Sequence, residues 1–436
     1  MRQTRLKGEA ETRAAERQAQ TAEREQQAEA QEPVWAYRLT WASVLLLLAF
    51  GLLMVFSASS IVGLFRENED GFYFLRQQAI TAAAGLILLF GISRLDYRRL
   101  RPLAFLGLGF AAFLLILVRV PGVGSEAGGA TRWLELGFIS LQPSEFAKLA
   151  VVVFGAHILS SRRILRGDQA AMFLRLVPPV GGLCLLILLQ PDLGTAVMVG
   201  MILLGLLWAA GMGRVQWFGL TGAAFAFAAV MIATADYRRQ RFLAFLDPFA
   251  DAQDSGFQIV QSLIAIGSGG LFGVGPGQSV QKFSYLPEAH TDMIFAIIGE
   301  EFGLLGITAV IALFAALLVS AWRIARGCAD PFGKYLVAGT VFLIGGQALL
   351  NMGGVMAALP LTGVPLPFIS FGRTNLLVVL AAVGIVLSVA RHCPLEVASG
   401  PASASSNQPK ELLDNVTYLD RRRGNGGTRR PRPSHS

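Results

Sequence analysis

Charged residues are scarce in this sequence. Only 15% of the 436 residues are Asp, Glu, Lys or Arg, against about 25% in an ordinary soluble domain. Hydrophobic residues make up 53%, so the composition excludes an ordinary soluble enzyme and indicates a membrane protein. The formal net charge of +8 does not call for a nucleic-acid partner, because its cations are divided between short loops and a basic tail.

Cysteine is rare as well. Cys184, Cys328 and Cys393 are the three cysteines, and they show neither the spacing of a zinc site nor the density of a disulfide framework. We expect each to lie in a membrane span or on the inner side, without a disulfide.

The first 33 residues lack a hydrophobic run, which excludes a cleavable signal peptide. Glu, Arg, Gln and Ala alternate through them, so residues 1–33 are expected to form a disordered or weakly helical cytoplasmic arm. Residues 392–436 are rich in Pro, Ser, Gly and Arg and predict a disordered basic tail. Residues 34–391 are left as the membrane domain.

Ten apolar stretches are long enough to cross a bilayer, at about 20 residues each. They lie at 39–58, 77–93, 102–118, 145–160, 172–189, 193–210, 216–234, 293–320, 335–357 and 374–390. We therefore expect an all-α polytopic membrane protein with ten transmembrane helices. Its longest connection, 235–292, follows the seventh span and would be extracytoplasmic.

Lys and Arg in the short connections orient these spans. Most lie in the loops after spans two, four, six and eight: Arg94, Arg98, Arg99, Arg101, Arg162, Arg163, Arg166, Arg175, Arg214, Arg323, Arg326 and Lys334. The positive-inside rule places these loops, and with them both termini, in the cytoplasm.

Polar residues also gather in the loops expected outside. Arg132 lies in the loop before the fourth span, and Glu145 and Lys148 follow one helical turn apart at the start of that span. The pair is either structural, with a snorkelling lysine, or part of a functional site. Asp192 precedes the sixth span, where an N-cap explains it as well as a functional role does.

The long loop 235–292 has three parts of interest. Arg238 and Arg239 concentrate cations on the outer side and are candidates for binding phosphates. Residues 257–266 are apolar but too short to span, which predicts an interfacial or re-entrant helix. Six glycines between 267 and 277 allow the backbone to approach a ligand or another helix closely, although no P-loop lysine follows.

The stretch 282–303, KFSYLPEAHTDMIFAIIGEEFG, joins the end of this loop to an apolar helix. Its polar residues before the helix include Lys282, Glu288, His290 and Asp292. Asp292 is the last of them, where a carboxylate would cap the helix N-terminus. Glu300 and Glu301 lie about 12–13 Å deeper and on different faces, so these three acids cannot all face one pocket.

The outer loop LPLTGVPLPFISFG, 359–372, has three prolines and two glycines among apolar residues and includes Ser370. Irregular apolar backbone at the membrane edge is tolerated only where it packs in protein or lines a cavity. This loop, the Arg132 loop, the Asp192 turn and the stretch ending at Asp292 all emerge on one side. We therefore predict a shared extracytoplasmic site.

Seven segments in order resemble the signatures of the SEDS family (shape, elongation, division and sporulation) over about residues 38–391: GGATRW, QPSEFAKL, QPDLGTA, FQIVQSLIAIGSGGLFGVG, LPEAHTDMIFAIIGEEFG, QALLNMGGV and LPLTGVPLPFISFG. The EAHTD wording and the long charged termini look more like the FtsW division branch than the RodA branch. The resemblance implies a ten-helix peptidoglycan glycosyltransferase at the outer face of the cytoplasmic (inner) membrane, at the division septum. Its substrate would be lipid II, the undecaprenyl-pyrophosphate-linked disaccharide peptide, and its partners an FtsI-like class B penicillin-binding protein and other division proteins.

The resemblance also implies that Asp292 is the catalytic carboxylate. Polymerisation needs a base for the acceptor hydroxyl and positive charge for the departing pyrophosphate. The candidate substrate-binding residues are Arg132, Lys148, Arg238, Arg239, Lys282, Glu288 and His290, with Glu145, Asp192, Glu300 and Ser370 in supporting positions. A divalent cation, Mg²⁺ or Mn²⁺, is left open as a further source of positive charge, with no ligands assigned.

A flippase or transporter of the lipid-linked precursor is the alternative. Its coupling charges would be expected near the midplane, on broken helices within an internal repeat. No clear repeat is visible in the sequence and, apart from Glu300 and Glu301, the acids lie at the outer ends of the spans. The enzyme is therefore favoured, and a noncatalytic scaffold would leave the outer motifs unexplained.

Deleting residues 1–33 and 395–436 together should leave polymerisation of lipid II close to the full-length rate. Both segments are polar and are expected across a hydrocarbon core about 30 Å thick from the outer loops. The measurement is glycan synthesis by the purified, truncated protein with its partner. Loss of activity with the membrane fold intact would contradict the expected topology or show an allosteric tail, and cysteine labelling from each side would separate these two cases.

Overall fold

The computed structural model describes residues 34–60, 70–127, 130–136, 139–254, 256–283, 286 and 289–393. The predicted arm 1–33, nearly all of the predicted tail and Glu288 lie outside the described residues. The helices are Val34–Ser60, α2 (Tyr73–Arg94), the 3₁₀ helix η1 (Tyr97–Leu100), α3 (Ala104–Leu117), α4 (Pro143–Leu159), α5 (Arg162–Leu165), α6 (Gln169–Leu188), α7 (Leu193–Ala209), α8 (Arg214–Ala233), α9 (Asp236–Leu246), α10 (Phe257–Gly269), α11 (Ile294–Gly327), α12 (Pro331–Val355) and α13 (Arg373–His392). The strands are β1 (Gly124–Ala127), β2 (Ala130–Leu136) and β3 (Ile139–Leu141).

Each of the ten apolar ranges predicted from the sequence coincides with a helix. Seven of the described helices are long and apolar enough to cross a membrane. The other three, α3, α4 and α7, have 14, 17 and 17 residues. The expectation of a helical, polytopic membrane protein is confirmed, and the short stretch predicted at 257–266 is the 13-residue helix α10.

Aspartate and proline begin several of these helices. Asp168, Asp192 and Asp330 each accept a hydrogen bond from a backbone N–H in the first turn of α6, α7 and α12. Proline stands at the start of α4 and of α12, where its missing N–H costs nothing. The predicted N-cap role of Asp192 is therefore confirmed.

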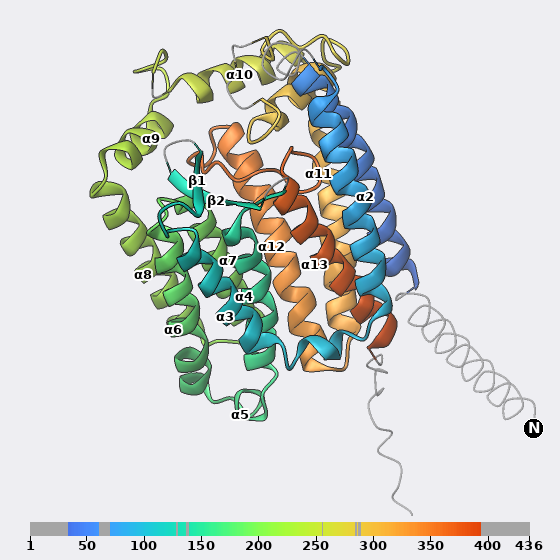
Figure 1. Cartoon of the computed structure of the whole chain (residues 1–436), viewed down its shortest axis with the longest axis vertical. Helices are drawn as coiled ribbons and strands as arrows, with labels where there is room; N and C mark the ends of the chain where they lie inside the picture. The colour runs from blue at the N-terminus through green and yellow to red at the C-terminus, as the bar shows by residue number, and fades with distance from the viewer. Residues whose placement is uncertain are drawn as a thin grey trace, which may run out of the picture. The chain divides into compact units, whose positions relative to one another are not determined.

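Helix α11 defines two ends of the bundle. It begins two residues after Asp292 and ends directly before Cys328, and its 34 residues correspond to a length of about 50 Å. We call these the Asp292 end and the Cys328 end. In Figure 1 the strands β1 and β2 and the helix α10 lie towards one end and α5 lies at the other.

The interior of the bundle is formed by α12 and α13. Helix α12 contacts α4, α7, α11 and α13, and α13 packs along α2. In contrast, no residue of α8 is buried, although the helix is apolar enough to span. Most of its side chains are exposed, while Trp217 packs towards the protein and donates to the carbonyl of Leu204 on α7 at 2.9 Å.

A small sheet was missed by the sequence analysis. Residues expected to form an irregular loop before α4 make three antiparallel strands in the order β1-β2-β3. Leu134 of β2 pairs with Leu141 of β3 and is buried. The strands are so short that their alternation of polar and apolar residues gives almost no signal above that of a loop.

Helix α11 is broken at Gly303, whose φ of +63° and ψ of −157° are not helical. The predicted glycine-rich segment packs across this break, where the N–H groups of Val274 and Gly275 donate to the carbonyls of Glu300 (3.0 Å) and Glu301 (3.1 Å). A Cβ at Gly303 would collide with this segment. The glycines therefore allow backbone to approach a helix, one of the two uses that the sequence left open.

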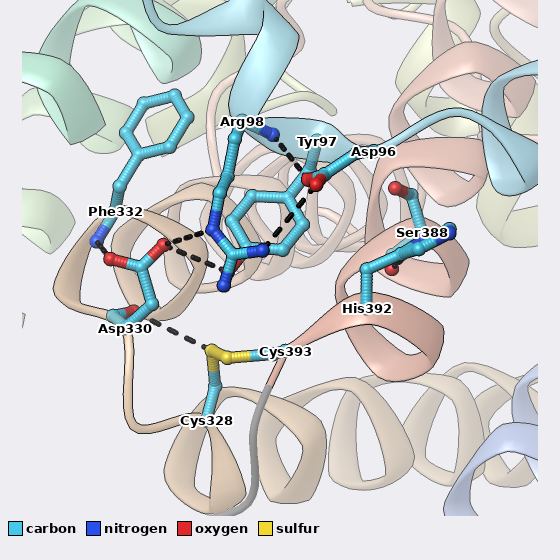
Figure 2. Close-up of a disulfide and its surroundings, with 9 residues drawn as sticks. All are labelled: Asp96, Tyr97, Arg98, Cys328, Asp330, Phe332, Ser388, His392 and Cys393. Atoms are coloured by element: carbon cyan, nitrogen blue, oxygen red, sulfur yellow. Dashed lines mark hydrogen bonds and ion pairs between the residues drawn. A yellow bond between two sulfur atoms is a disulfide. The ribbon is translucent and has the colours of Figure 1, made fainter.

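The prediction that the cysteines form no disulfide was wrong. Cys328 and Cys393 are joined by a disulfide between the ends of α11 and α13, while Cys184 is free (Figure 2). The two residues are 65 positions apart, and sequence spacing does not reveal that two helix ends meet. The bond closes the Cys328 end of the bundle.

Polar contacts support the same end. The Tyr97 hydroxyl donates to Asp330 at 2.8 Å, and the Arg98 guanidinium lies 3.7 Å from the same carboxylate (Figure 2). Burial raises the pKa of Tyr97 above its usual range. The connection between α2 and α3 is thereby tied to the start of α12.

Replacing Gly51 with alanine should destabilise the fold. An added Cβ would meet the backbone of Phe368 and Ile369, and overpacking of this kind typically costs about 1–3 kcal/mol. The check is thermal unfolding in detergent. Gly91→Ala is the control, because nothing lies within 4 Å of its Cβ position; equal unfolding temperatures for the two variants would contradict this packing.

Candidate active site

The irregular segment Leu359–Gly372, here called the site loop, lies at the Asp292 end between α12 and α13. Three buried amide side chains donate to its carbonyls: Gln347 to Pro365 at 2.8 Å, Asn351 to Val364 at 2.9 Å and Gln78 to Ser370 at 3.1 Å. The Ser370 hydroxyl accepts the N–H of Leu366 at 2.8 Å. Backbone carbonyls without hydrogen bonds would be costly in this apolar setting. Amide side chains of α2 and α12 supply those bonds here.

Asp292 lies directly against the site loop. The Asn351 side chain donates to the Asp292 carbonyl at 2.8 Å. A Cβ at Gly363, where φ is +68°, would lie 3.4 Å from Oδ2 of Asp292. The half-buried carboxylate therefore sits beside the bare backbone of a glycine whose conformation other residues rarely adopt.

The predicted capping role of Asp292 was wrong in register. Helix α11 begins at Ile294, its N-cap is Met293, and no side chain caps it. Asp292 belongs to the turn before the helix. That turn is held to the site loop by the N–H of Phe371, which donates to the carbonyl of His290 at 2.9 Å.

His290 packs in an aromatic cluster beside Asp292. Its ring centroid lies 4.6 Å from that of Phe74 on α2 and 5.8 Å from that of Phe371 in the site loop. The side chain is half-buried. The structure thus places His290 next to the proposed catalytic carboxylate and fixes its ring by packing.

Asp192 reaches the site loop through its own turn. Its carboxylate accepts from the N–H of Thr195 at 3.0 Å and from the hydroxyl of Ser144 at 3.4 Å. Gly194, in the first turn of α7, packs on the carbonyl of Thr362 with no room for a Cβ. Asp192 therefore caps α7, and the first turn of α7 packs against the site loop.

Arg132 of β2 caps the end of α6. Its Nε donates to the carbonyl of Gln190 at 3.0 Å, and an Nη donates to that of Pro191. Positive charge is favoured at a helix C-terminus. The side chain is half-buried, so part of the guanidinium remains open to solvent at the Asp292 end.

Glu145 and Lys148 form a buried ion pair on α4. Their N–O distance is 2.7 Å, with side-chain exposures of 3% and 1%. Lys148 also donates to Gln347 at 3.1 Å, and Asn375 donates to Glu145 at 2.8 Å. The pair therefore connects α4 to the amide that holds the site loop, and its charges are matched within the protein.

Lys282 is also engaged. Its Nζ lies 3.2 Å from Glu301, with side-chain exposures of 4% and 0%, and donates to the carbonyl of Gly277 at 2.7 Å. Ser57 of the Val34–Ser60 helix donates to Glu301 at 2.6 Å. This cluster ties the glycine-rich segment to two helices.

Glu300 serves the same segment from the neighbouring position. It accepts hydrogen bonds from the Ser279 hydroxyl and, at 2.9 Å, from the N–H of Val280. Glu300 and Glu301 hold the glycine-rich segment rather than sharing the surroundings of Asp292, which agrees with the angular argument from the sequence.

Arg238 and Arg239 lie on α9, in a segment that had been expected only as a loop. Arg239 pairs with Asp236 at 2.8 Å, one turn earlier, and both side chains are largely exposed. Arg238 is half-buried. Among the described residues no group of three or more His, Cys, Asp and Glu side chains is arranged to hold a metal ion.

The amides of Gln78, Gln347 and Asn351 were missed as functional candidates. The sequence did carry a signal, because Gln347 and Asn351 stand one turn apart within an otherwise apolar span, and polar side chains inside membrane helices are costly unless they bind a partner. What could not be read from the sequence is that their partner is the backbone of a loop.

The Cell cycle protein family model of FtsW, RodA and SpoVE matches residues 37–394. The chain belongs to this family. The match covers all the helices that surround the site loop. It includes Asp292 and the three amides.

Relatives support the assignment along most of the chain. The probable peptidoglycan glycosyltransferase FtsW of Thioalkalivibrio sulfidiphilus is 45% identical over 363 residues, which cover 82% of this chain and 90% of that protein. The crystal structure of the rod shape determining protein RodA of Thermus thermophilus is similar with a TM-score of 0.60 at 30% identity, covering 81% of this chain and 95% of that one.

A second solved structure is similar with a TM-score of 0.64 at 30% identity, covering 80% of this chain and 97% of that one. It is described as the structural coordination of polymerization and crosslinking by a peptidoglycan synthase complex. The helical fold of this chain is thus that of the FtsW and RodA proteins.

Replacing Lys148 alone should destabilise the protein strongly. Lys148→Met leaves the Glu145 carboxylate buried without its cation, which typically costs about 3–5 kcal/mol. The double variant Glu145→Gln/Lys148→Met removes both charges and should recover most of the loss. Unfolding in detergent measures both, with wild type and Glu145→Gln completing the cycle.

A different result would reassign Lys148. If Lys148→Met unfolds like the parent but no longer turns over lipid II, the lysine contacts substrate rather than serving the fold.

Proposed function

We propose that this chain is a peptidoglycan glycosyltransferase that polymerises lipid II, with Asp292 as the base at the acceptor sugar. The observation that carries this proposal is the packing of Asp292 against the site loop, at an end of the bundle where the Arg132 strand and the Asp192 turn also meet. The relatives named as probable peptidoglycan glycosyltransferases match this chain over 363 and 367 residues.

The reaction needs few groups beyond a base. The acceptor hydroxyl must lose a proton as it attacks the anomeric carbon, and the pyrophosphate must leave from the opposite side. Asp292 is half-buried, which suits a carboxylate that must meet a substrate and yet be shielded from bulk water.

Positive charge for the pyrophosphate would come from Arg132, Arg238 and Arg239, whose side chains are exposed or half-buried. Guanidinium groups bind phosphate oxygens in pairs. Lys148 and Lys282 are less suited, because each is almost fully buried in an ion pair with a glutamate. In our proposal these two lysines support the architecture and the arginines meet the leaving group.

The chain is a multi-pass protein of the cytoplasmic membrane. We propose ten spans, with both termini in the cytoplasm and the Asp292 end outside. The ten apolar ranges coincide with helices, and the short connections rich in Lys and Arg all belong to the Cys328 end, as the positive-inside rule requires of a cytoplasmic face.

We further propose that a class B penicillin-binding protein of the FtsI type is the partner and the division septum the place of action. Support comes from the fold shared with a chain of a peptidoglycan synthase complex that couples polymerization and crosslinking, and from the FtsW-type relatives. The exposed apolar helices leave surface for a partner within the membrane.

One observation favours the alternative function. The break of α11 at Gly303 next to Glu300 and Glu301 is a feature expected of a transporter of the lipid-linked precursor. Glu300, however, accepts a hydrogen bond from the N–H of Val280, and Glu301 pairs with Lys282. These contacts indicate a structural role for both carboxylates. Purified protein in vesicles with fluorescent lipid II separates the two: transport without polymer would favour the flippase, and polymer without transport the enzyme.

Asp292→Asn should abolish polymerisation of lipid II while the unfolding temperature stays near that of the parent. The amide keeps the size of the side chain but cannot accept the proton, and a general base typically contributes about 10²–10⁴-fold to the rate. The measurement is glycan length and yield from labelled lipid II with the purified protein and its partner.

Asp254→Asn is the matched control, because Asp254 lies exposed in the same long connection. It should retain the parental rate. Substantial polymerisation by Asp292→Asn would overturn the assignment of the base.

A further inference from the structure

We propose that Asn351 is a positioning residue for Asp292, an inference that rests on the proposed function of Asp292 as the base. Asn351 lies in the last turns of α12 and is only 3% exposed. Its Nδ2 donates to two carbonyls from separate segments, that of Asp292 at 2.8 Å and that of Val364 at 2.9 Å. One side-chain nitrogen thus joins the turn before α11 to the site loop.

These two hydrogen bonds set the position of the turn that carries Asp292 relative to the site loop. An asparagine has two N–H donors, and both are used here. Gly363 directly precedes Val364. A Cβ placed on Gly363 would lie 3.4 Å from Oδ2 of Asp292. Fixing the two carbonyls therefore fixes the backbone of Asp292 beside the site loop, and the carboxylate extends from that backbone to Gly363.

The other two amides hold the site loop without reaching the Asp292 turn by these bonds. Gln347 donates to Pro365, and Gln78 donates to Ser370. Of these three amides, Asn351 is the one bonded both to the site loop and to the turn that carries the base. Loss of the Asn351 amide is thus expected to lower the rate of the reaction itself, in addition to loosening the site loop.

The Asn351 side chain also carries an acceptor, its amide oxygen Oδ1. Oδ1 of Asn351 is buried without a hydrogen-bond partner among the described residues. A buried acceptor in that state opposes folding. An apolar side chain would avoid this penalty but would leave the carbonyls of Asp292 and Val364 without their donor, so the amide serves the contacts that it makes with both segments.

The test compares Asn351→Leu with Thr340→Val in the polymerisation of labelled lipid II. Leucine has the same branching as asparagine, with methyl groups in place of the amide nitrogen and oxygen, so it removes both donors and the unsatisfied acceptor. Thr340 is an equally buried polar residue of the same helix that donates to the carbonyl of Leu336 at 3.0 Å, and valine removes that bond while keeping the branched shape. Unfolding temperature, kcat and KM are measured for both.

Asn351→Leu should lower kcat about tenfold or more, since a displacement near 1 Å at a reacting group can cost about 10²-fold, while KM for lipid II stays within about threefold. Thr340→Val should keep its kcat within about twofold of the parent even if it unfolds at a lower temperature, because Thr340 lies about three helical turns before Asn351 on α12.

Three results would overturn the inference: parental kcat in folded Asn351→Leu, an equal loss of kcat in Thr340→Val, or a rise in KM with kcat unchanged. Asp292→Asn in the same assay separates the two proposals. If Asp292→Asn is inactive while Asn351→Leu is fully active, only the role of Asn351 is lost. If Asp292→Asn remains active, the proposed base itself is wrong.

Discussion

The site depends on hydrogen bonds between buried amide side chains and the backbone of one irregular loop. A loop with three prolines cannot satisfy its own carbonyls by helical bonding, and within an apolar setting each bare carbonyl would be costly. Gln78, Gln347 and Asn351 meet this need. Because they project from α2 and α12, the loop is fixed to two helices of the bundle, one of them in its interior, and Asp292 is fixed to the loop.

Two buried ion pairs also help to fix the site loop and the glycine-rich segment. Lys148 and Lys282 were candidates for substrate binding from the sequence, but they are neutralised within the protein by Glu145 and Glu301. Buried ion pairs contribute little net stability, yet breaking one is expensive, so they act as rigid joints. One joint reaches the site loop through Gln347, and the other anchors the glycine-rich segment at the break in α11.

Much of this could be predicted from the sequence. Long apolar runs are a strong signal, so the ten helices, the short α10 and the gathering of polar loops at one end followed directly. The three short strands and the Cys328–Cys393 disulfide did not, because both depend on contacts that leave no periodic pattern. The N-cap at Asp292 was misplaced by one residue, since the chain makes a further turn before α11. Spacing alone also could not show that Lys148 and Lys282 are already paired.

We propose that the site loop presents Asp292 to the acceptor sugar of lipid II. The most direct measurement is a cryo-electron microscopy structure of the inactive Asp292→Asn variant with two lipid II molecules bound in its donor and acceptor positions. We expect the attacking hydroxyl of the acceptor within about 3 Å of the residue 292 side chain, with that side chain still lying over Gly363. An acceptor hydroxyl elsewhere in the bundle, or beside another carboxylate, would contradict it.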